Sequence, residues 1–154
     1  MSSAPAVSAI VSLSDSAWQA QVFEAMRSEG QRFTIPRRQI ISWITARSAP
    51  FSAEDLVEAM GARHEGIGRS TVYRTVDWLR AEGWLGRVGG EAGEHTYART
   101  LPGHHHHAVC TQCGQTLVVS GCAVVEALGQ TLAEQGFMVS RHTLEIFGTC
   151  ANCK

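Results

Sequence analysis

Two Cys-x-x-Cys pairs constrain the fold of this 154-residue chain more than any other feature of its sequence. The pairs are Cys110-Thr-Gln-Cys113 and Cys150-Ala-Asn-Cys153, and residues 114–149 separate them. A two-residue gap lets both thiolates of a pair bind one ion, and two such pairs complete a closed tetrahedral zinc site. A redox role is the alternative for either pair alone. Two pairs near opposite ends of one short segment favour structural zinc, whose binding contributes to folding.

The composition is typical of a folded intracellular protein. Hydrophobic residues make up 44% of the chain, enough for one good core or two small ones. No apolar run approaches the roughly 18 residues that span a bilayer, and the N-terminal segment does not resemble a signal peptide. We therefore expect a cytoplasmic protein without a membrane partner, whose five cysteines stay reduced and bind metal rather than form disulfides.

Charge is distributed unevenly, although the formal net charge is only −1. From Arg27 to Arg87, ten arginines stand against seven acidic residues, and lysine is absent. Six of the seven histidines and all five cysteines follow Glu94. This asymmetry predicts an N-terminal half that faces a polyanion and a C-terminal half that binds metal. Arginines that merely solvate helix surfaces are the alternative.

The N-terminal half has the hydrophobic periodicity of helices followed by a hairpin. Residues 1–14 are small and polar and predict a flexible tail. Apolar spacing and capping residues predict helices over 15–28, 36–46, from Ser52 to about Met60, and from Gly68 or Ser70 to Gly83. Two strands, 84–88 and 95–99, follow with a glycine-rich turn between them. This order is that of a winged helix, in which the last helix enters the major groove of DNA.

The C-terminal half predicts a smaller mixed unit. Residues 100–103 form a short connector, and 104–154 suit a strand, a cysteine knuckle, a second strand, a helix and a last strand. The helix spans about 123–135, with Val124, Leu128 and Leu132 expected to face inward, and the last strand spans 142–147.

A run of four histidines, His104 to His107, lies just before the first knuckle. In an extended chain, His104 and His106 share one face while His105 and His107 share the other. The two pairs can therefore serve two different ions, and imidazole suits zinc, nickel, iron(II) and copper. His142, on the last strand, either joins one of these pairs or is an exposed strand histidine.

One cysteine is left over. Cys122 has no partner at ligand spacing, so we interpret it as a small core residue.

Together these features resemble the ferric uptake regulator family, which includes iron, zinc, manganese, nickel and peroxide sensors. The matching segments extend from about Thr34 to Cys153 and are TIPRRQII, FSAEDLVEAM, GRSTVYRTVDWLRAEG, HHHHAVCTQCG and HTLEIFGTCANC. The resemblance implies an α+β fold with an N-terminal winged-helix DNA-binding domain and a small α/β dimerisation domain that carries a four-cysteine structural zinc site. It also implies a homodimeric repressor that binds palindromic operator DNA when loaded with metal, and not an enzyme.

The resemblance assigns DNA contacts to the fourth helix. Tyr73 and Arg74 match residues that meet bases and phosphates, Ser70 matches a neighbouring contact, and Arg69 precedes it. Arg37 matches the basic residue after the family's proline. The chemistry agrees, because arginine can bond guanine bidentately and a tyrosine ring can contact a thymine methyl. Partial core packing is the alternative for Tyr73.

The resemblance also assigns three metal sites. The four paired cysteines match the structural zinc site, His105 and His107 match a sensing site at the hinge, and His104, His106 and His142 match a further site. The expected cofactors are structural Zn²⁺ and a second, regulatory divalent metal. Zinc is favoured, and the alternatives are an iron, manganese, nickel or peroxide sensor of the same family, a zinc enzyme and a metal buffer.

The sequence departs from the family at positions that supply further ligands. Pro50, Ala98, Thr100 and Val118 stand where family members have further ligands. Either His95 or His64 completes the hinge site, or water molecules complete it and the metal binds weakly. At the further site Val125 replaces a carboxylate, and the neighbouring Glu126 is the expected substitute.

Overall fold

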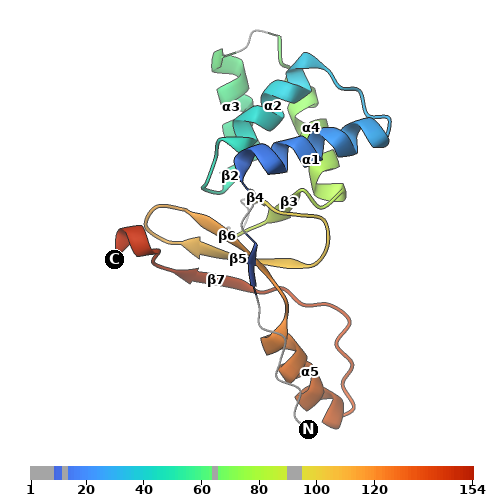
Figure 1. The fold of residues 1–154 in the computed structure, drawn as a ribbon, viewed down its shortest axis with the longest axis vertical. Coiled ribbons are helices and arrows are strands. Elements are labelled where there is room, and N and C mark those ends of the chain that lie inside the picture. The colour runs from blue at the N-terminus through green and yellow to red at the C-terminus, as the bar shows by residue number, and fades with distance from the viewer. Residues whose placement is uncertain (1–8, 12–13, 64–65, 90–94) are drawn as a thin grey trace.

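The structure is a computed structural model that describes residues 9–11, 14–63, 66–89 and 95–154. A helical unit lies on one side of a four-stranded sheet, and one helix, α5, projects from the far end of that sheet (Figure 1). The first unit contains α1 (Asp15–Ser28), α2 (Ile35–Thr45), β2 (Phe51–Ser52), α3 (Ala53–Arg63), α4 (Arg69–Ala81), β3 (Leu85–Arg87) and β4 (Thr96–Arg99). The second contains β1 (Ala9–Val11), β5 (His105–Cys110), β6 (Thr116–Ser120), α5 (Ala123–Glu134), β7 (Glu145–Gly148) and the 3₁₀ turn η1 (Ala151–Cys153).

Local capping explains where the first three helices begin. The Ser14 hydroxyl accepts from the N–H of Ala17 at the start of α1, and Thr34 caps α2, which has a proline in its first turn. Before α3, the Ser52 N–H donates to Asp55 at 2.7 Å while the Asp55 N–H donates to the Ser52 hydroxyl at 3.0 Å. This reciprocal capping box confirms the start predicted for that helix.

The main core lies inside the helical unit. Trp18, Val22 and Met26 form the buried face of α1, as their spacing predicts. Trp18 packs edge-on against Trp84 with ring centroids 6.5 Å apart. Its indole N–H donates to the carbonyl of Thr100 at 2.9 Å, in the connector between the two units. The core of the first unit is therefore tied directly to the segment that leads into the second.

Two sheets complete the architecture. In the helical unit β2, β4 and β3 pair antiparallel in the order β2-β4-β3, with Phe51 opposite Tyr97. The second sheet has the order β1-β6-β5-β7, and β7 runs parallel to β5 with Cys110 opposite Gly148. The predicted last strand begins at Glu145 rather than at residue 142. Pairing with β5 sets this start, and no local signal in the sequence marks it.

The predicted tail over residues 1–14 needs correction. Ala9–Val11 form β1, which pairs antiparallel with β6 so that Ile10 lies opposite Val119. Residues 1–8 and 12–13 lie outside the described part of the chain. Because α1 follows soon after β1, this segment links the C-terminal sheet to the helical unit.

The helix α5 is more exposed to solvent than the sequence predicts. Its apolar residues Val124, Leu128 and Leu132 were expected to face inward, but they are 65%, 58% and 37% exposed. That expectation is wrong for the single chain, because α5 projects away from the sheet (Figure 1). Among the described residues, no helix is both long and apolar enough to cross a membrane.

Candidate metal centres and nucleic-acid interface

The structure brings the four paired cysteines together at one end of the sheet. One sulfur from each of Cys110, Cys113, Cys150 and Cys153 lies within 4.8 Å of the other three. The parallel pairing of β7 with β5 causes this convergence, because it carries the second pair alongside the end of β5. The Cys113 and Cys150 sulfurs are 3.6 Å apart, and the Cys150 N–H donates to the Cys110 sulfur at 3.4 Å.

Backbone geometry shapes each knuckle. Gly114 has φ +75°, a conformation that favours glycine, and its N–H donates to the carbonyl of Cys110 at 2.9 Å. The second pair spans η1, where the N–H of Cys153 donates to the carbonyl of Cys150 at 3.0 Å. These two turns point the thiols of each pair toward a common centre.

The electrostatics of this cluster match a cation. Backbone N–H groups of Cys113 and Cys150 lower the pKa of Cys110 to about 6, which favours its thiolate. The neighbouring thiols of Cys150 and Cys113 raise the pKa of Cys153 to about 12. Four thiolates at this separation repel one another unless a cation lies among them, and a four-sulfur tetrahedral set suits zinc.

A second cluster lies at the opposite end of β5. The Nε2 atom of His104 is 3.2 Å from that of His106 and 2.9 Å from that of His142. The Cys122 sulfur is 3.0 Å from His106 Nε2 and 3.4 Å from His142 Nε2. His106 is buried, and burial together with the nearby His104 lowers its pKa, which favours the neutral imidazole that binds metal.

Cys122 corrects two sequence-based interpretations. It is not an isolated core residue, because it is half-buried and contributes a donor to the histidine cluster. Glu126, the expected carboxylate ligand, is exposed on the first turn of α5 and is not among the clustered donors. Cys122 lies three residues before Val125, the position at which the resemblance to the family leads us to expect a carboxylate. Its nearness in sequence to the missing carboxylate is the signal that points to Cys122, whereas its separations from the histidines in sequence give none.

The structure does not assemble the predicted hinge site from its described residues. His95 is exposed before β4 and joins no cluster of metal donors, and His64 lies outside the described residues. His105 and His107 are brought to the same face of β5, and His105 Nδ1 and His107 Nε2 are buried without a hydrogen-bond partner. Burial lowers the pKa of His107, and its hydrogen bond to the backbone of Arg99 partly offsets this.

His107 also packs closely against the helical unit. A Cβ atom added at Gly86 on β3 would lie 2.4 Å from Cε1 of His107. Real Cβ atoms are essentially never found so close to another heavy atom. Gly86 therefore leaves room for this imidazole between the hairpin and the C-terminal sheet.

Helix α4 has one buried and one exposed face. Val72, Val76 and Leu79 lie in the core, whereas Tyr73 and Arg74 are exposed. The order of three helices, this helix and the β3–β4 pair matches the predicted winged helix. The core-packing alternative for Tyr73 does not describe its position, because its side chain lies at the surface.

Two of the predicted DNA contacts on α4 have partners within the protein. The guanidinium of Arg69 contacts Glu54 on α3 at 2.5 Å, and the Tyr73 hydroxyl donates to the same carboxylate. The hydrogen bond from Tyr73 and then that from Arg69 lower the pKa of Glu54. Ser70 is exposed on the first turn of α4.

Arg37, the remaining predicted contact, is held at the start of α2. It donates to the side chain of Gln31 at 3.1 Å and to the carbonyl of Arg32 at 3.2 Å. Its guanidinium therefore braces the loop between α1 and α2 in this structure.

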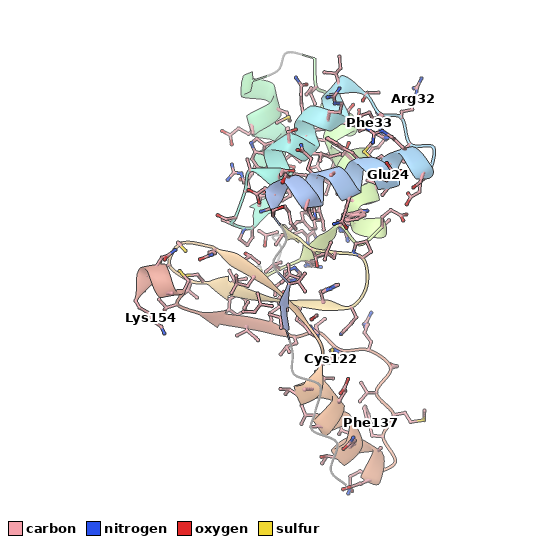
Figure 2. The ribbon with its side chains drawn as sticks, viewed as in Figure 1. Glu24, Arg32, Phe33, Cys122, Phe137 and Lys154 are labelled. Carbon is pink, nitrogen blue, oxygen red and sulfur yellow. The ribbon has the colours of Figure 1, made fainter. Side chains whose placement is uncertain are left out.

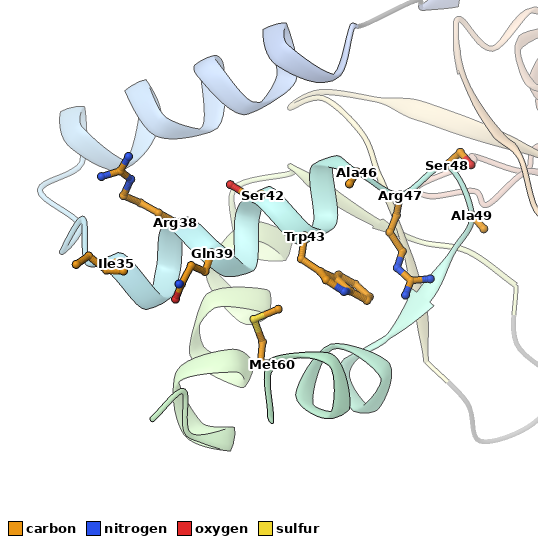
Figure 3. A pocket seen from close by; sticks show the side chains of 10 residues that line it. All are labelled: Ile35, Arg38, Gln39, Ser42, Trp43, Ala46, Arg47, Ser48, Ala49 and Met60. Carbon is orange, nitrogen blue, oxygen red and sulfur yellow. The ribbon is translucent and has the colours of Figure 1, made fainter. Parts of the chain in front are cut away.

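An open groove runs along α2 and carries no metal-binding chemistry (Figure 3). Arg47 stacks over Trp43 at 4.0 Å, and Arg38 lies at the other end of the groove. The residues lining it include no histidine, cysteine, aspartate or glutamate. The groove therefore offers neither a metal ligand nor a general acid or base of these types.

Comparisons with known proteins agree with this arrangement. Residues 28–147 match the model of the ferric uptake regulator family. The chain is 35% identical over 129 residues to the zinc uptake regulation protein of Mycobacterium tuberculosis, covering 84% of this chain and 99% of that protein. It is 30% identical to the ferric uptake regulation protein of Shigella flexneri over 128 residues, covering 82% of this chain and 86% of that protein.

Solved structures share the fold. A zinc uptake regulator complexed with zinc and DNA superposes with a TM-score of 0.68 at 24% identity, covering 92% of this chain and 96% of that one. A zinc-bound manganese uptake regulator has a TM-score of 0.56 at 28% identity, covering 84% and 98% respectively. This chain therefore shares the fold of these regulators, and its own cysteines supply the four-cysteine cluster of its C-terminal unit.

Proposed function

Because this chain belongs to the ferric uptake regulator family, we propose that it is a metal-dependent, DNA-binding transcriptional repressor that controls zinc uptake or homeostasis. One observation carries the proposal. A winged helix that exposes Tyr73 and Arg74 is joined by a short connector to a unit with two separate sets of metal donors. The relationship to a zinc uptake regulation protein favours zinc over the other metals. Because its target is DNA, we place the protein in the cytoplasm.

The proposed domains follow the two units. Residues 15–99 form the DNA-binding domain, 100–103 the hinge and 104–154 the dimerisation and metal-binding domain. β1, from the segment before residue 15, adds to the sheet of the second domain. A homodimer places two α4 helices about 34–36 Å apart, one turn of DNA, which fits a palindromic operator.

The proposed metal sites have different roles. The four cysteines hold structural zinc, which closes the end of the sheet where β5 and β7 meet. We assign the regulatory metal to the cluster that contains His104, because its four donors already lie together. His105 and His107 face the hinge and offer two further imidazoles there, to which His95 remains a proposed partner.

The DNA interface includes Arg37, Arg69, Ser70, Tyr73 and Arg74. We expect Arg69 and Tyr73 to leave Glu54 when DNA binds, because phosphate competes for the same donors. The exposed Arg74 has no ion-pair partner among the described residues, so it can reach a base without breaking a salt bridge.

Arg74→Ala should weaken binding to the specific operator by about 1–3 kcal/mol, the usual contribution of a good base contact. Fluorescence anisotropy with labelled operator, at fixed salt, measures the change. Arg27→Ala, which removes the same charge from α1, is the matched control and should have a smaller effect. Equal losses in the two variants would remove Arg74 from the base-contact set.

The proposed function is tested by metal titration. Protein that retains its tightly bound zinc is titrated with Zn(II), Mn(II), Fe(II) or Ni(II), while binding to its own promoter and to random DNA is followed. We expect Zn(II) to raise specific affinity by about tenfold or more, the coupling typical of allosteric ligands. If metal binds without any change in specific DNA affinity, the protein is a metal buffer rather than a metal-dependent repressor.

A further inference from the structure

We propose that Cys122 is the fourth ligand of the regulatory metal and that its thiolate makes this site select zinc over manganese(II). This inference rests on the proposed function and specifies the chemistry of its sensing site.

The geometry of the cluster is that of four ligands around one ion. Five distances between the donor atoms of His104, His106, Cys122 and His142 range from 2.9 to 3.4 Å. A tetrahedral zinc with bonds of about 2.0–2.3 Å separates its ligand atoms by roughly 3.3–3.7 Å. An adjustment of a few tenths of an ångström would therefore admit zinc without moving any backbone element.

The position of Cys122 leaves its sulfur free for this role. Cys122 is the N-cap residue of α5, yet its side chain makes no capping hydrogen bond to the helix. The polar contacts recorded for its sulfur are instead the ring nitrogens of His106 and His142. Figure 2 places Cys122 at the junction between the sheet and α5, where the chain enters the helix.

No carboxylate takes part in the described cluster. Glu126 is linked to Cys122 only through its backbone N–H, which donates to the Cys122 carbonyl at 2.7 Å, and its side chain is exposed. The donor set is therefore three imidazoles and one thiolate. Thiolate and imidazole in tetrahedral geometry favour zinc, whereas manganese(II) favours oxygen ligands and octahedral geometry.

The same arrangement explains how metal can act on the rest of the molecule. His106 lies on β5, Cys122 lies at the start of α5, and His142 lies in the segment before β7. An ion bound to all three fixes the direction in which α5 leaves the sheet. Because α5 carries exposed apolar residues, zinc at this site orders a surface that lies outside the core of the single chain.

The test compares Cys122→Ser and Cys122→Asp with the parent protein and with Glu126→Gln as the matched control. Protein that retains its structural zinc is titrated with cobalt(II), whose bond to a thiolate gives a charge-transfer band in the near ultraviolet. Affinities for Zn(II) and Mn(II) are then measured by competition with a chelator.

We expect the charge-transfer band in the parent and in Glu126→Gln and its loss in Cys122→Ser. Zinc affinity should fall at least about tenfold in Cys122→Ser, since loss of groups that only support a ligand already costs that much. In Cys122→Asp the ratio of zinc to manganese affinity should fall by at least the same factor, because a carboxylate suits manganese.

Two results would overturn the proposal. One is a cobalt spectrum that does not depend on Cys122, and the other is a loss of zinc affinity in Glu126→Gln equal to that in Cys122→Ser. Failure of the repressor function gives a different pattern. In that case the cobalt charge-transfer band and the metal affinities change in the Cys122 variants as expected, which supports the ligand assignment. Zinc binding nevertheless leaves the affinity for DNA unchanged.

Discussion

Cys113→Ser is expected to remove the zinc from the four-cysteine site and to unfold the end of the sheet that this site closes. The Cys113 sulfur lies 3.6 Å from that of Cys150, so it joins the two knuckles directly. Structural zinc sites bind their ion with about 10–16 kcal/mol, comparable to the roughly 5–15 kcal/mol that stabilises a whole domain. We therefore expect the variant to lose one equivalent of zinc and most of the cooperative thermal transition of the C-terminal unit.

Metal content measured by atomic emission and thermal unfolding followed by circular dichroism check this result. Gln112→Ala is the matched control, because Gln112 is exposed in the same knuckle and contributes only backbone to the site. The control should keep its zinc and its thermal transition. A Cys113→Ser protein that retains both would contradict a structural role for the cluster.

The parts of the fold that depend on local chemistry could be predicted from the sequence. The reciprocal hydrogen bonds of Ser52 and Asp55 involve residues three apart, so the start of α3 is encoded within one turn. The two knuckles are likewise local, and their spacing predicted a common four-cysteine site. The alternation of strand side chains separated His104 and His106 from His105 and His107 without knowledge of the tertiary structure.

The structural features that the sequence did not predict depend on contacts between residues that are far apart in the sequence. β1 and β2 have three and two residues, too few to show a period, and they are strands only because β6 and β4 pair with them. Cys122 meets His106 and His142 across 16 and 20 residues of sequence, through the joint placement of β5, α5 and the segment before β7. No spacing rule for metal ligands covers such separations.

The packing at the hinge also depends on residues that are distant in the sequence. Strand alternation placed His105 and His107 on one face, and the resemblance to the family indicated the positions where hinge ligands are missing. Neither could indicate that Gly86, on a strand of the other unit, leaves the space that the His107 ring occupies. Burial of His107 is therefore a property of how the two units pack.

The helix α5 illustrates what periodicity can and cannot predict. The spacing of Val124, Leu128 and Leu132 correctly indicated one apolar face, but periodicity does not say which chain covers it. The same unit also exposes Ile146 and Phe147 on β7, at 47% and 55%. An exposed apolar face such as that of α5 marks an interaction surface. A second copy of the chain is the partner that the family's homodimers indicate.

Leu128→Asp is therefore expected to convert the homodimer into monomers. Leu128 is the middle of the three apolar residues of α5, and in a symmetric dimer each substitution alters the interface twice. Loss of about 2 kcal/mol of apolar burial per copy gives roughly 4 kcal/mol, or about a thousandfold weaker dimerisation, before the cost of burying the charge. Affinity for a palindromic operator should fall with it, because a monomer engages one half-site.

Sedimentation velocity over a range of protein concentrations measures this change. Gln130→Asp adds the same charge two residues along α5, at an exposed position on another face, and it should remain dimeric. Because Leu128 contributes nothing to the core of the single chain, both variants should keep their zinc and their helical circular dichroism. A fully dimeric Leu128→Asp protein would place the dimer interface elsewhere and would leave the apolar face of α5 without an assigned partner.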